Sequence, residues 1–504
     1  MSFQRATILL MLVALVSKCL GFLREVFLAY FYGASAVSDA YLIALTIPGV
    51  IFSFIGAALT IGYVPIFSVI RERGGDFNRF TNNLINITFI ISTFLIVVTC
   101  IYTDFIVEFF APGFDDETSS LAVLFTRIFV LGIYASALIH IYTGLLQVNN
   151  SFVAASFAGV PFNFVILLSI YLSAKFGTTY LIVGALVAKL IELLFFAPYL
   201  MRLGYRYAPV LDFRDKDVRS LFFLATPLIL SVSVNQINIL VDRSLASTLA
   251  VGGISALTYA HHLNQFVLGV FVISIATVVF PAFSKAFVAG EVEDLNKRLS
   301  DSISLVSFLV IPSSIFFMVF ANPIVSVVYG RGEFDDEALK MTSSSLFYFS
   351  VGMIGFAYRE ILSRLFYAMH DSKTAVINAV IGVLINIVLS LILSRYMGVA
   401  GLAFATSISA IITSLLLFFS LSKIIKSWGA SAAMIDFCKL LIASLVATII
   451  AWCFSSIYFI ESSFIELIFS FFVISFIYIL LAWFFKISIL LSFAHAFNAK
   501  FFGR

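Results

Sequence analysis

Charged side chains within long apolar stretches are the residues of this sequence best placed to do chemistry. The first stretch carries Lys18, Arg24 and Glu25, and the second carries Asp39 near its start. A charged side chain at the centre of a bilayer costs at least about 2.5 kcal/mol, so it needs a partner, a cavity or a function there. On one helix, Lys18 and Arg24 would lie about 9 Å apart along the axis. A ligand with two phosphate groups could contact both cations; alternatively, Arg24 forms a structural ion pair with Glu25 or Asp39.

A second set of polar residues lies in the seventh and eighth apolar stretches. Asp242 and Arg243 are adjacent in the seventh stretch, where Asp242 either binds a coupling ion or proton or forms an internal salt bridge. His261 and His262 lie in the eighth stretch, and no further ligands at useful spacing indicate a metal site. An unperturbed imidazole titrates near pH 6.5, so a histidine that lines a cavity could gain a charge. Otherwise these histidines pack between helices.

Sequence motifs typical of enzymes are missing. No G-x-x-x-x-G-K-[ST] loop is present, which excludes this type of ATPase site for primary pumping. The acidic pairs Asp115–Asp116 and Asp335–Asp336 could act as catalytic carboxylates, but they lie in short loops where acidic residues are the expected background. The four cysteines lie in apolar runs without metal-ligand spacing. We therefore expect no catalytic activity, no metal, no bound cofactor and no nucleic-acid partner.

The composition determines which elements must position these residues. Hydrophobic residues make up 62% of the 504 residues, charged residues make up 11%, and the mean hydropathy is +1.10. Soluble domains carry roughly 25% charged residues, so lipid must be the solvent here. In hydrocarbon every backbone polar group must be satisfied internally, which leaves helices or closed barrels. The apolar runs are continuous and do not alternate as barrel strands do. The sequence therefore predicts an all-α polytopic membrane protein.

The apolar segments predict about fourteen transmembrane helices, because each is long enough for the roughly 20 residues that one span needs. The segments are 6–32, 37–70, 80–103, 119–147, 152–174, 178–201, 218–248, 254–284, 299–329, 338–369, 374–396, 399–422, 433–458 and 464–485.

The loops between these segments alternate in charge. Basic residues concentrate in alternate loops, for example at 71–79 and 202–219, and the intervening loops near 115 and 335 are acidic. Basic loops stay on the cytoplasmic side of a membrane. The pattern predicts a multi-pass protein of the bacterial cytoplasmic membrane with both termini in the cytoplasm. The residues placed on that side include Lys426, between the twelfth and thirteenth segments, and Lys500 and Arg504 after the last one.

The sequence also contains an internal repeat. The matching positions are Gly159–Asn163 (GVPFN) with Gly382–Asn386 (GVLIN), Arg24 with Arg243, and Gly33 with Gly252. The halves share their topology, so the repeat is parallel, with an axis along the membrane normal. It predicts pseudo-symmetric six-helix lobes at 1–205 and 206–426, with a two-helix appendage at 427–504. Two facing lobes suggest a central cavity and alternating access.

Several segments together resemble one family of transporters. They are Ser17–Glu25 (SKCLGFLRE), Phe31–Gly33 (FYG), Ser38–Tyr41 (SDAY), Tyr63–Pro65 (YVP), Asn235–Asn238 (NQIN), Val241–Ser247 (VDRSLAS), Ser255–Ala260 (SALTYA), Phe280–Ser284 (FPAFS), Tyr329–Phe334 (YGRGEF) and Ser350–Gly352 (SVG). In this order and at these spacings, they resemble the MviN/MurJ family, the lipid II flippases of the multidrug/oligosaccharidyl-lipid/polysaccharide exporter superfamily.

The resemblance implies transport of undecaprenyl-pyrophosphate-linked peptidoglycan precursor from the inner to the outer leaflet. It implies a cationic central cavity, for which the candidate substrate-binding residues are Lys18, Arg24, Asp39, Arg243 and His262, with Asp242 as the coupling-ion candidate. A cationic cavity can hold the pyrophosphate and the polar head, and a groove beside the last two helices can hold the lipid tail. An ion gradient or the membrane potential would supply the energy. The expected partners are the lipid-linked glycan, membrane lipids and the cell-wall synthesis machinery.

The sequence departs from the family pattern at cavity positions. Lys18 replaces a usual arginine and loses its bidentate fork, Pro48–Phe54 lacks the usual cation, Gly56–Ala57 lacks an acid, and His262 stands where arginine is usual. A less cationic cavity keeps open a flippase for another undecaprenyl-linked glycan, of the O-antigen or exopolysaccharide type. A cation-coupled multidrug antiporter is a further alternative, but it would favour acidic cavity residues. A membrane glycosyltransferase lacks its catalytic residues.

Overall fold

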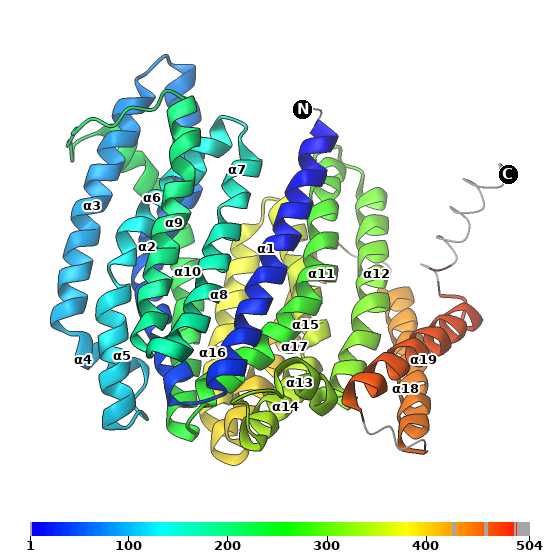
Figure 1. The fold of residues 1–504 in the computed structure, drawn as a ribbon. Helices are drawn as coiled ribbons and strands as arrows, with labels where there is room; N and C mark the ends of the chain where they lie inside the picture. Colours follow the sequence, from blue (N-terminus) through cyan, green and yellow to red (C-terminus); the bar gives the residue numbers. More distant parts are fainter. Residues whose placement is uncertain (1–2, 426–429, 458–461, 488–489, 491–504) are drawn as a thin grey trace. The chain divides into compact units, whose positions relative to one another are not determined.

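The described part of the chain is entirely helical in its regular secondary structure. The structure, a computed structural model, describes residues 3–425, 430–457, 462–487 and 490. Within these ranges it has nineteen helices and no strand (Figure 1). The predicted all-α class is confirmed. The extreme ends of the chain and Lys426, whose cytoplasmic location the charge pattern predicts, lie outside the described residues.

The helices divide into two compact units. The N-terminal unit comprises residues 1–255 and 331–334. Its helices are α1 (Phe3–Tyr32), α2 (Ala36–Glu72), α3 (Phe77–Ile101), α4 (Thr103–Phe110), α5 (Asp116–Phe129), α6 (Gly132–Val148), α7 (Phe152–Phe157), α8 (Gly159–Phe176), α9 (Thr179–Arg202) and α10 (Lys216–Leu249). In this unit α2 packs against α5, α6 and α10, so α10 belongs with the first helices by packing. The sequence places the same helix in the second repeat, and the lobe boundaries it predicts stay a prediction.

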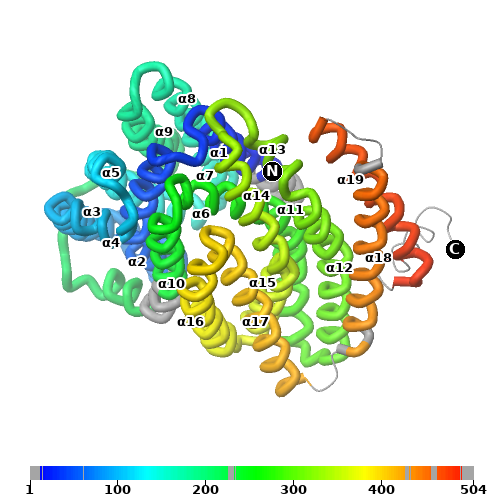
Figure 2. Tube along the Cα trace, turned by 90° about the horizontal axis from the view of Figure 1, so that it is seen from below, coloured from blue at the N-terminus to red at the C-terminus, as the bar shows by residue number. Residues whose placement is uncertain are grey.

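The C-terminal unit comprises residues 256–330 and 335–504. Its helices are α11 (Gly253–Val288, whose first three residues belong to the other unit), α12 (Val292–Val319), α13 (Ala321–Tyr329), α14 (Asp336–Val351), α15 (Met353–Ala368), α16 (Ser372–Met397), α17 (Val399–Ile424), α18 (Ala430–Ile457) and α19 (Ser463–Phe484). Within this unit α18 lies beside α12, and α19 packs against α18 and α13 (Figure 2). The last two helices thus cover one side of the unit.

Each of the fourteen predicted segments falls on one helix or on two consecutive helices. Segment 119–147, for example, falls on α5 and α6, which bend by 44° at their junction. Within the described residues ten helices are long and apolar enough to cross a membrane, or eleven if this bent pair counts as one span. The count of fourteen spans stays a prediction. Large apolar side chains such as Phe164 and Phe476 are exposed, as expected where lipid covers them.

Glycines permit two close approaches in the N-terminal unit. Gly33 and Gly252, which match in the internal repeat, both adopt positive φ, at 61° and 78°. A Cβ atom would lie 2.3 Å from the Glu333 carbonyl oxygen at Gly33 and 2.1 Å from the Ala34 carbonyl oxygen at Gly252. Only glycine fits such positions without strain. The repeat therefore extends to the backbone conformation of its matching turns.

The linker between α9 and α10, residues 203–215, is held along α3 by asparagine side chains. The buried Asn83 donates to the Asp212 carbonyl at 2.9 Å and accepts from the Asp212 N–H at 2.7 Å. Asn86 donates to the Val210 carbonyl at 2.7 Å. The linker forms no helix or strand of its own, so these side chains on α3 supply hydrogen-bond partners for its backbone polar groups.

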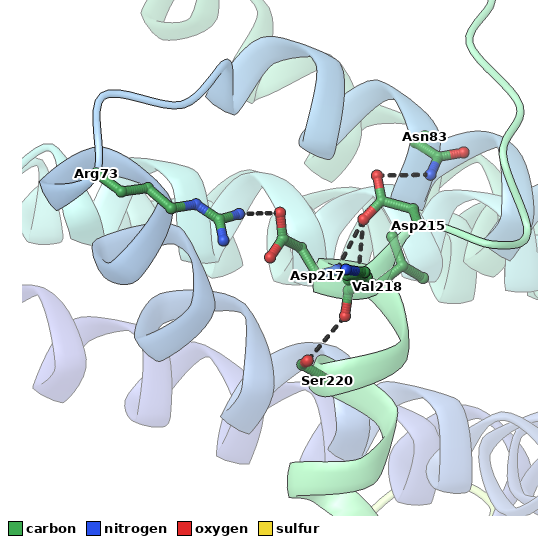
Figure 3. Close-up of polar contacts among 7 residues, drawn as sticks. Arg73, Asn83, Asp215, Asp217, Val218 and Ser220 are labelled. Atoms are coloured by element: carbon green, nitrogen blue, oxygen red, sulfur yellow. Dashed lines mark hydrogen bonds and ion pairs between the residues drawn. The ribbon is translucent and has the colours of Figure 1, made fainter.

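The same linker begins α10 with a capped turn. Asp215 accepts from the backbone N–H groups of Asp217 and Val218, at 2.8 and 3.3 Å. Asp217 forms an ion pair with Arg73, and Asn83 donates to Asp215 at 3.3 Å (Figure 3). The two bonds to the Asp215 side chain satisfy N–H groups in the first turn of α10, which have no partner within the helix.

Candidate functional site

A cavity of about 570 Å³ lies inside the N-terminal unit. We call it the N-terminal cavity. It is bounded by helices α1, α2, α5, α6, α8, α9 and α10. The lining residues important for its chemistry are Arg24, Phe52, Gly56, Thr60, His140 and Lys189. Pro48 of α2 also lines it and cannot donate the usual hydrogen bond to the carbonyl four residues earlier. Gly49 beside it has open space where a Cβ would stand. The central part of α2 therefore leaves room that ordinary helix packing would fill.

The charged groups on the cavity wall are basic. Arg24 of α1 and Lys189 of α9 line the cavity, and among the described lining residues none is a carboxylate. Arg24 pairs with Glu25 at 2.6 Å, and Lys189 pairs with Glu192 at 2.9 Å. Both carboxylates lie outside the lining, so the cations and not their counter-charges face the cavity. Most of the wall is apolar, which strengthens electrostatic interactions with a bound anion.

A third polar group on the wall is His140 of α6. Its Nδ1 lies 2.8 Å from Thr60 Oγ1 on α2, and its ring lies 5.8 Å from the Phe52 ring. A Cβ at Gly56 would lie 3.3 Å from His140 Nε2. Neither His140 nor Lys189 is among the candidate residues that the sequence indicates. The signal that could have found His140 is its place in the predicted span 119–147.

The two first-helix cations that the sequence predicts as binding residues have different surroundings in the structure. Arg24 lines the N-terminal cavity, whereas Lys18 is exposed and is absent from the lining. Of the two structural alternatives for Arg24, the side chain takes the ion pair with Glu25. This pair leaves the guanidinium at the cavity wall. A role of either cation in substrate binding stays a prediction.

Asp39 is buried, with 1% of its surface exposed, and does not line the N-terminal cavity. Its Oδ1 accepts from the N–H of Ser255 at 2.7 Å and from the Ser255 hydroxyl at 2.6 Å. Ser255 lies in the first turn of α11, where N–H groups have no partner within the helix. Asp39 therefore supplies the cap of this helix from α2.

The repeat-related charge pair joins the same network. Arg243 is partly buried on α10, and its charge interacts with the carboxylates of Asp39, Glu25 and Asp242. Asn238 donates to Asp242 Oδ2 at 3.3 Å. Asp242 thus accepts a hydrogen bond from its own helix and lies close enough to Arg243 for their charges to interact. Its predicted role in an internal salt bridge stays a prediction. A role as a coupling-ion site stays a prediction.

His262 belongs to the C-terminal unit and lies on α11, where it is partly buried. The ring of the preceding His261 lies 6.4 Å from it and 5.4 Å from the Phe349 ring in an edge-on arrangement. Among the described residues, no group of three or more His, Cys, Asp or Glu side chains could hold a metal ion. The role of His262 in binding stays a prediction.

The C-terminal unit contains an apolar groove of about 340 Å³. Helices α12, α15, α17 and α18 form it, and its lining includes Ile303, Phe418 and Met434. Tyr358 is the largest polar side chain in the groove, and its hydroxyl is hydrogen-bonded to the Ser307 hydroxyl at 2.6 Å. A groove with such walls can accept a hydrocarbon chain.

The family model of lipid II flippase MurJ matches residues 28–485. The chain belongs to the MurJ family. The probable lipid II flippase MurJ of Vibrio cholerae is 30% identical over 430 residues, which cover 82% of each chain. That of Treponema pallidum is 24% identical over 442 residues, which cover 85% of this chain and 82% of the relative. These matches confirm the resemblance seen in the sequence motifs.

Solved structures of the MurJ family and of a wider transporter superfamily are similar to this fold. A lipid II flippase MurJ in an inward closed conformation has a TM-score of 0.83 and 28% identity, with 95% of this chain and 99% of that chain covered. An inward-facing multidrug resistance MATE family transporter of the MOP superfamily has a TM-score of 0.70 and 15% identity, with coverage of 84% and 98%. The second similarity concerns the fold alone. The chain is thus a multi-span membrane protein of the MurJ family.

Proposed function

We propose that this protein moves lipid II, the undecaprenyl-pyrophosphate-linked peptidoglycan precursor, from the cytoplasmic to the outer leaflet by alternating access. The observation that carries the proposal is the family match over residues 28–485. It is a transporter and not an enzyme, because a flippase moves its lipid-linked glycan without changing a covalent bond. The N-terminal cavity supplies the chemistry that such a substrate needs.

The pyrophosphate is the part of the substrate that the N-terminal cavity suits. Arg24 presents a planar guanidinium, which can bind a phosphate group through two parallel hydrogen bonds. Lys189 adds a second positive charge from the helix α9. The wall around both groups is mostly apolar, so their attraction to an anion exceeds that of the same groups in bulk solvent. The volume is within the usual range of about 300–1,000 Å³ for ligand pockets, which fits a pyrophosphate and adjoining sugar better than a whole glycopeptide.

The proposal also covers the binding of the lipid tail, the orientation of the protein in the membrane and the energy source for transport. The apolar groove of the C-terminal unit has the chemistry to hold part of the undecaprenyl tail. The basic loops favour a protein of the bacterial cytoplasmic membrane with both termini in the cytoplasm. An ion gradient or the membrane potential drives transport, and Asp242 is the coupling-ion candidate. The cell-wall synthesis machinery, which consumes lipid II, is the proposed protein partner.

Two alternative functions are less well supported than transport of lipid II. A cation-coupled multidrug antiporter needs acidic cavity residues, whereas the described lining of the N-terminal cavity has only basic charged groups. A flippase for O-antigen or exopolysaccharide precursors would use the same pyrophosphate contacts. The family match favours lipid II over that second candidate.

Complementation of a conditional lipid II flippase mutant tests the proposal. The full chain should restore growth and cell shape when the resident flippase is depleted. Purified protein in vesicles should also move lipid II faster than an undecaprenyl-pyrophosphate-linked O-antigen unit. Failure to complement at normal membrane abundance, with faster movement of the O-antigen unit, would replace lipid II with the second candidate.

A further inference from the structure

The Nδ1 atom of His140 is fixed by a hydrogen bond whose direction can be assigned. Thr60 Oγ1 lies 2.8 Å from the Gly56 carbonyl oxygen and 2.8 Å from His140 Nδ1. A hydroxyl has one hydrogen, and a carbonyl oxygen can only accept. Thr60 therefore donates to Gly56, and His140 Nδ1–H donates to Thr60. The neutral imidazole then carries its free lone pair on Nε2.

The side of Nε2 that lies against α2 is left uncovered because residue 56 is glycine. The Cβ of any other residue at this position would lie 3.3 Å from Nε2 and its further atoms would cover it. Gly56, Thr60 and His140 all line the cavity. A proton added to Nε2 would therefore convert an acceptor on the wall into a charged donor.

The groups around His140 set the conditions for that proton. Lys189 on α9 and Arg24 on α1 are cations in the same lining, and Glu192 is held in the ion pair with Lys189. On α2 the neighbours are the uncharged Thr60 and the ring of Phe52. The parts of α5, α8 and α10 that line the cavity carry no ionisable side chain within the described residues. The positive charge of Lys189 opposes a further positive charge on His140 in the empty cavity, and a bound polyanion reverses that effect.

We propose that His140 Nε2, together with Lys189, forms an anion subsite of the N-terminal cavity that takes up one proton when a pyrophosphate group binds. The proton comes from water when the anion enters, and it returns to water when the anion leaves. No covalent bond is made or broken. The Phe52 ring, with its centroid 5.8 Å from that of the imidazole, can stabilise the imidazolium through its π face.

The subsite deepens the proposed function and rests on it for the source of the pyrophosphate. It makes binding of the anion stronger at lower pH, because the added charge exists only in the protonated imidazole. A pyrophosphate carries enough charge to engage His140 and Lys189 while Arg24 holds a second phosphoryl group. A single phosphate would bind either to His140 and Lys189 or to Arg24, but not to all three.

The test measures proton uptake by the full-length protein in lipid nanodiscs. Inorganic pyrophosphate is titrated calorimetrically in buffers of different ionisation enthalpy, for wild type and for His140→Asn. Asparagine can keep the hydrogen bond to Thr60 but cannot bind a proton at the Nε2 position. Pyrophosphate itself titrates, so the readout is the difference between the two proteins. We expect about one proton more per bound anion for wild type at pH 7.5.

The control is His370→Asn, since His370 is exposed, lies in the C-terminal unit and adopts a positive φ of 59° that asparagine tolerates. It should behave as wild type. Equal proton uptake by wild type and His140→Asn would overturn the proposal. Thr60→Val provides a second variant if His140→Asn fails to accumulate. It removes the acceptor of Nδ1–H, so the pH midpoint of binding must move, and an unchanged midpoint also overturns the proposal.

Two further measurements test which anion binds and whether the subsite and the proposed function hold independently of each other. Pyrophosphate should bind at least tenfold more tightly than inorganic phosphate, and equal binding would overturn the assignment to pyrophosphate. Proton uptake that depends on His140 in a protein that fails to complement the flippase mutant would keep the subsite and reject lipid II. Complementation without such uptake would keep lipid II and reject the subsite.

Discussion

Asp39 of α2 accepts two hydrogen bonds from Ser255, one from its N–H at 2.7 Å and one from its hydroxyl at 2.6 Å. Loss of a capping acceptor typically costs about 0.5–2 kcal/mol, and here it also leaves a buried N–H unsatisfied. We expect Asp39→Ala to lower the thermal unfolding temperature of the purified protein and its membrane abundance. Asp39→Asn retains an acceptor oxygen and should be milder. Normal stability of Asp39→Ala with lost transport would favour the substrate-binding role instead.

Arg24 is the cation for which the clearest transport defect is expected. Arg24→Ala should abolish complementation at normal membrane abundance, because hydrogen bonds to a charged ligand contribute about 1.5–3 kcal/mol. Arg24→Lys should retain partial activity, since a point charge replaces the planar fork. Growth of the depleted strain and immunoblots of its membranes give the measurement. Full activity of Arg24→Ala would show that the substrate does not depend on this residue.

His262 offers a test in the C-terminal unit. If it supplies a conditional charge for the substrate, His262→Arg should strengthen binding or transport, and His262→Gln should weaken transport most at higher pH. If it only packs between helices, His262→Gln should be silent and His262→Arg should lower abundance. Flipping assays from pH 6 to 8, paired with membrane levels, separate these outcomes. A silent glutamine variant across this range would retire the idea.

The charge pattern of the loops predicts their sides of the membrane. Single cysteines introduced near residues 115 and 335 should react with an impermeant thiol reagent added to intact cells. Cysteines near 75 and 210 should react only after permeabilisation, because basic loops stay in the cytoplasm. These experiments need a background without the four native cysteines. Labelling near 210 from outside would contradict the predicted topology.

The linker 203–215 depends on α3 for its hydrogen bonds. Asn83→Ala removes both bonds to Asp212, at a cost of about 1–3 kcal/mol for the groups left unsatisfied. We expect faster proteolysis and faster hydrogen exchange within the linker. Asn78→Ala is the matched control, since Asn78 lies on the same helix and its Oδ1 has no hydrogen-bond partner in the described chain. Equal protection of the linker in both variants would mean that other contacts hold it.

The cavity shows how far sequence reasoning can place a side chain. The sequence singles out both Lys18 and Arg24, but the structure exposes Lys18 and puts Arg24 on the cavity wall. Their orientation differs because they lie roughly 120° apart around one helix, and only the neighbouring helices decide which face is enclosed. His140 could have been suspected as a polar residue in a predicted span. Its importance depends on Gly56, which lies 84 residues earlier and approaches it only in the folded unit.

The sequence by itself determined the helical class, the positions of the helices and the family. Length and continuity of an apolar run are local properties, and lipid forces every such run to satisfy its backbone within a helix. The family motifs are likewise written in the chain. Only the tertiary structure decided that Asp39 caps Ser255, that Arg24 and Lys189 face one cavity, and that α10 packs with the first unit. These relationships depend on helix rotation and on partners far away in sequence, which the packing of side chains alone selects.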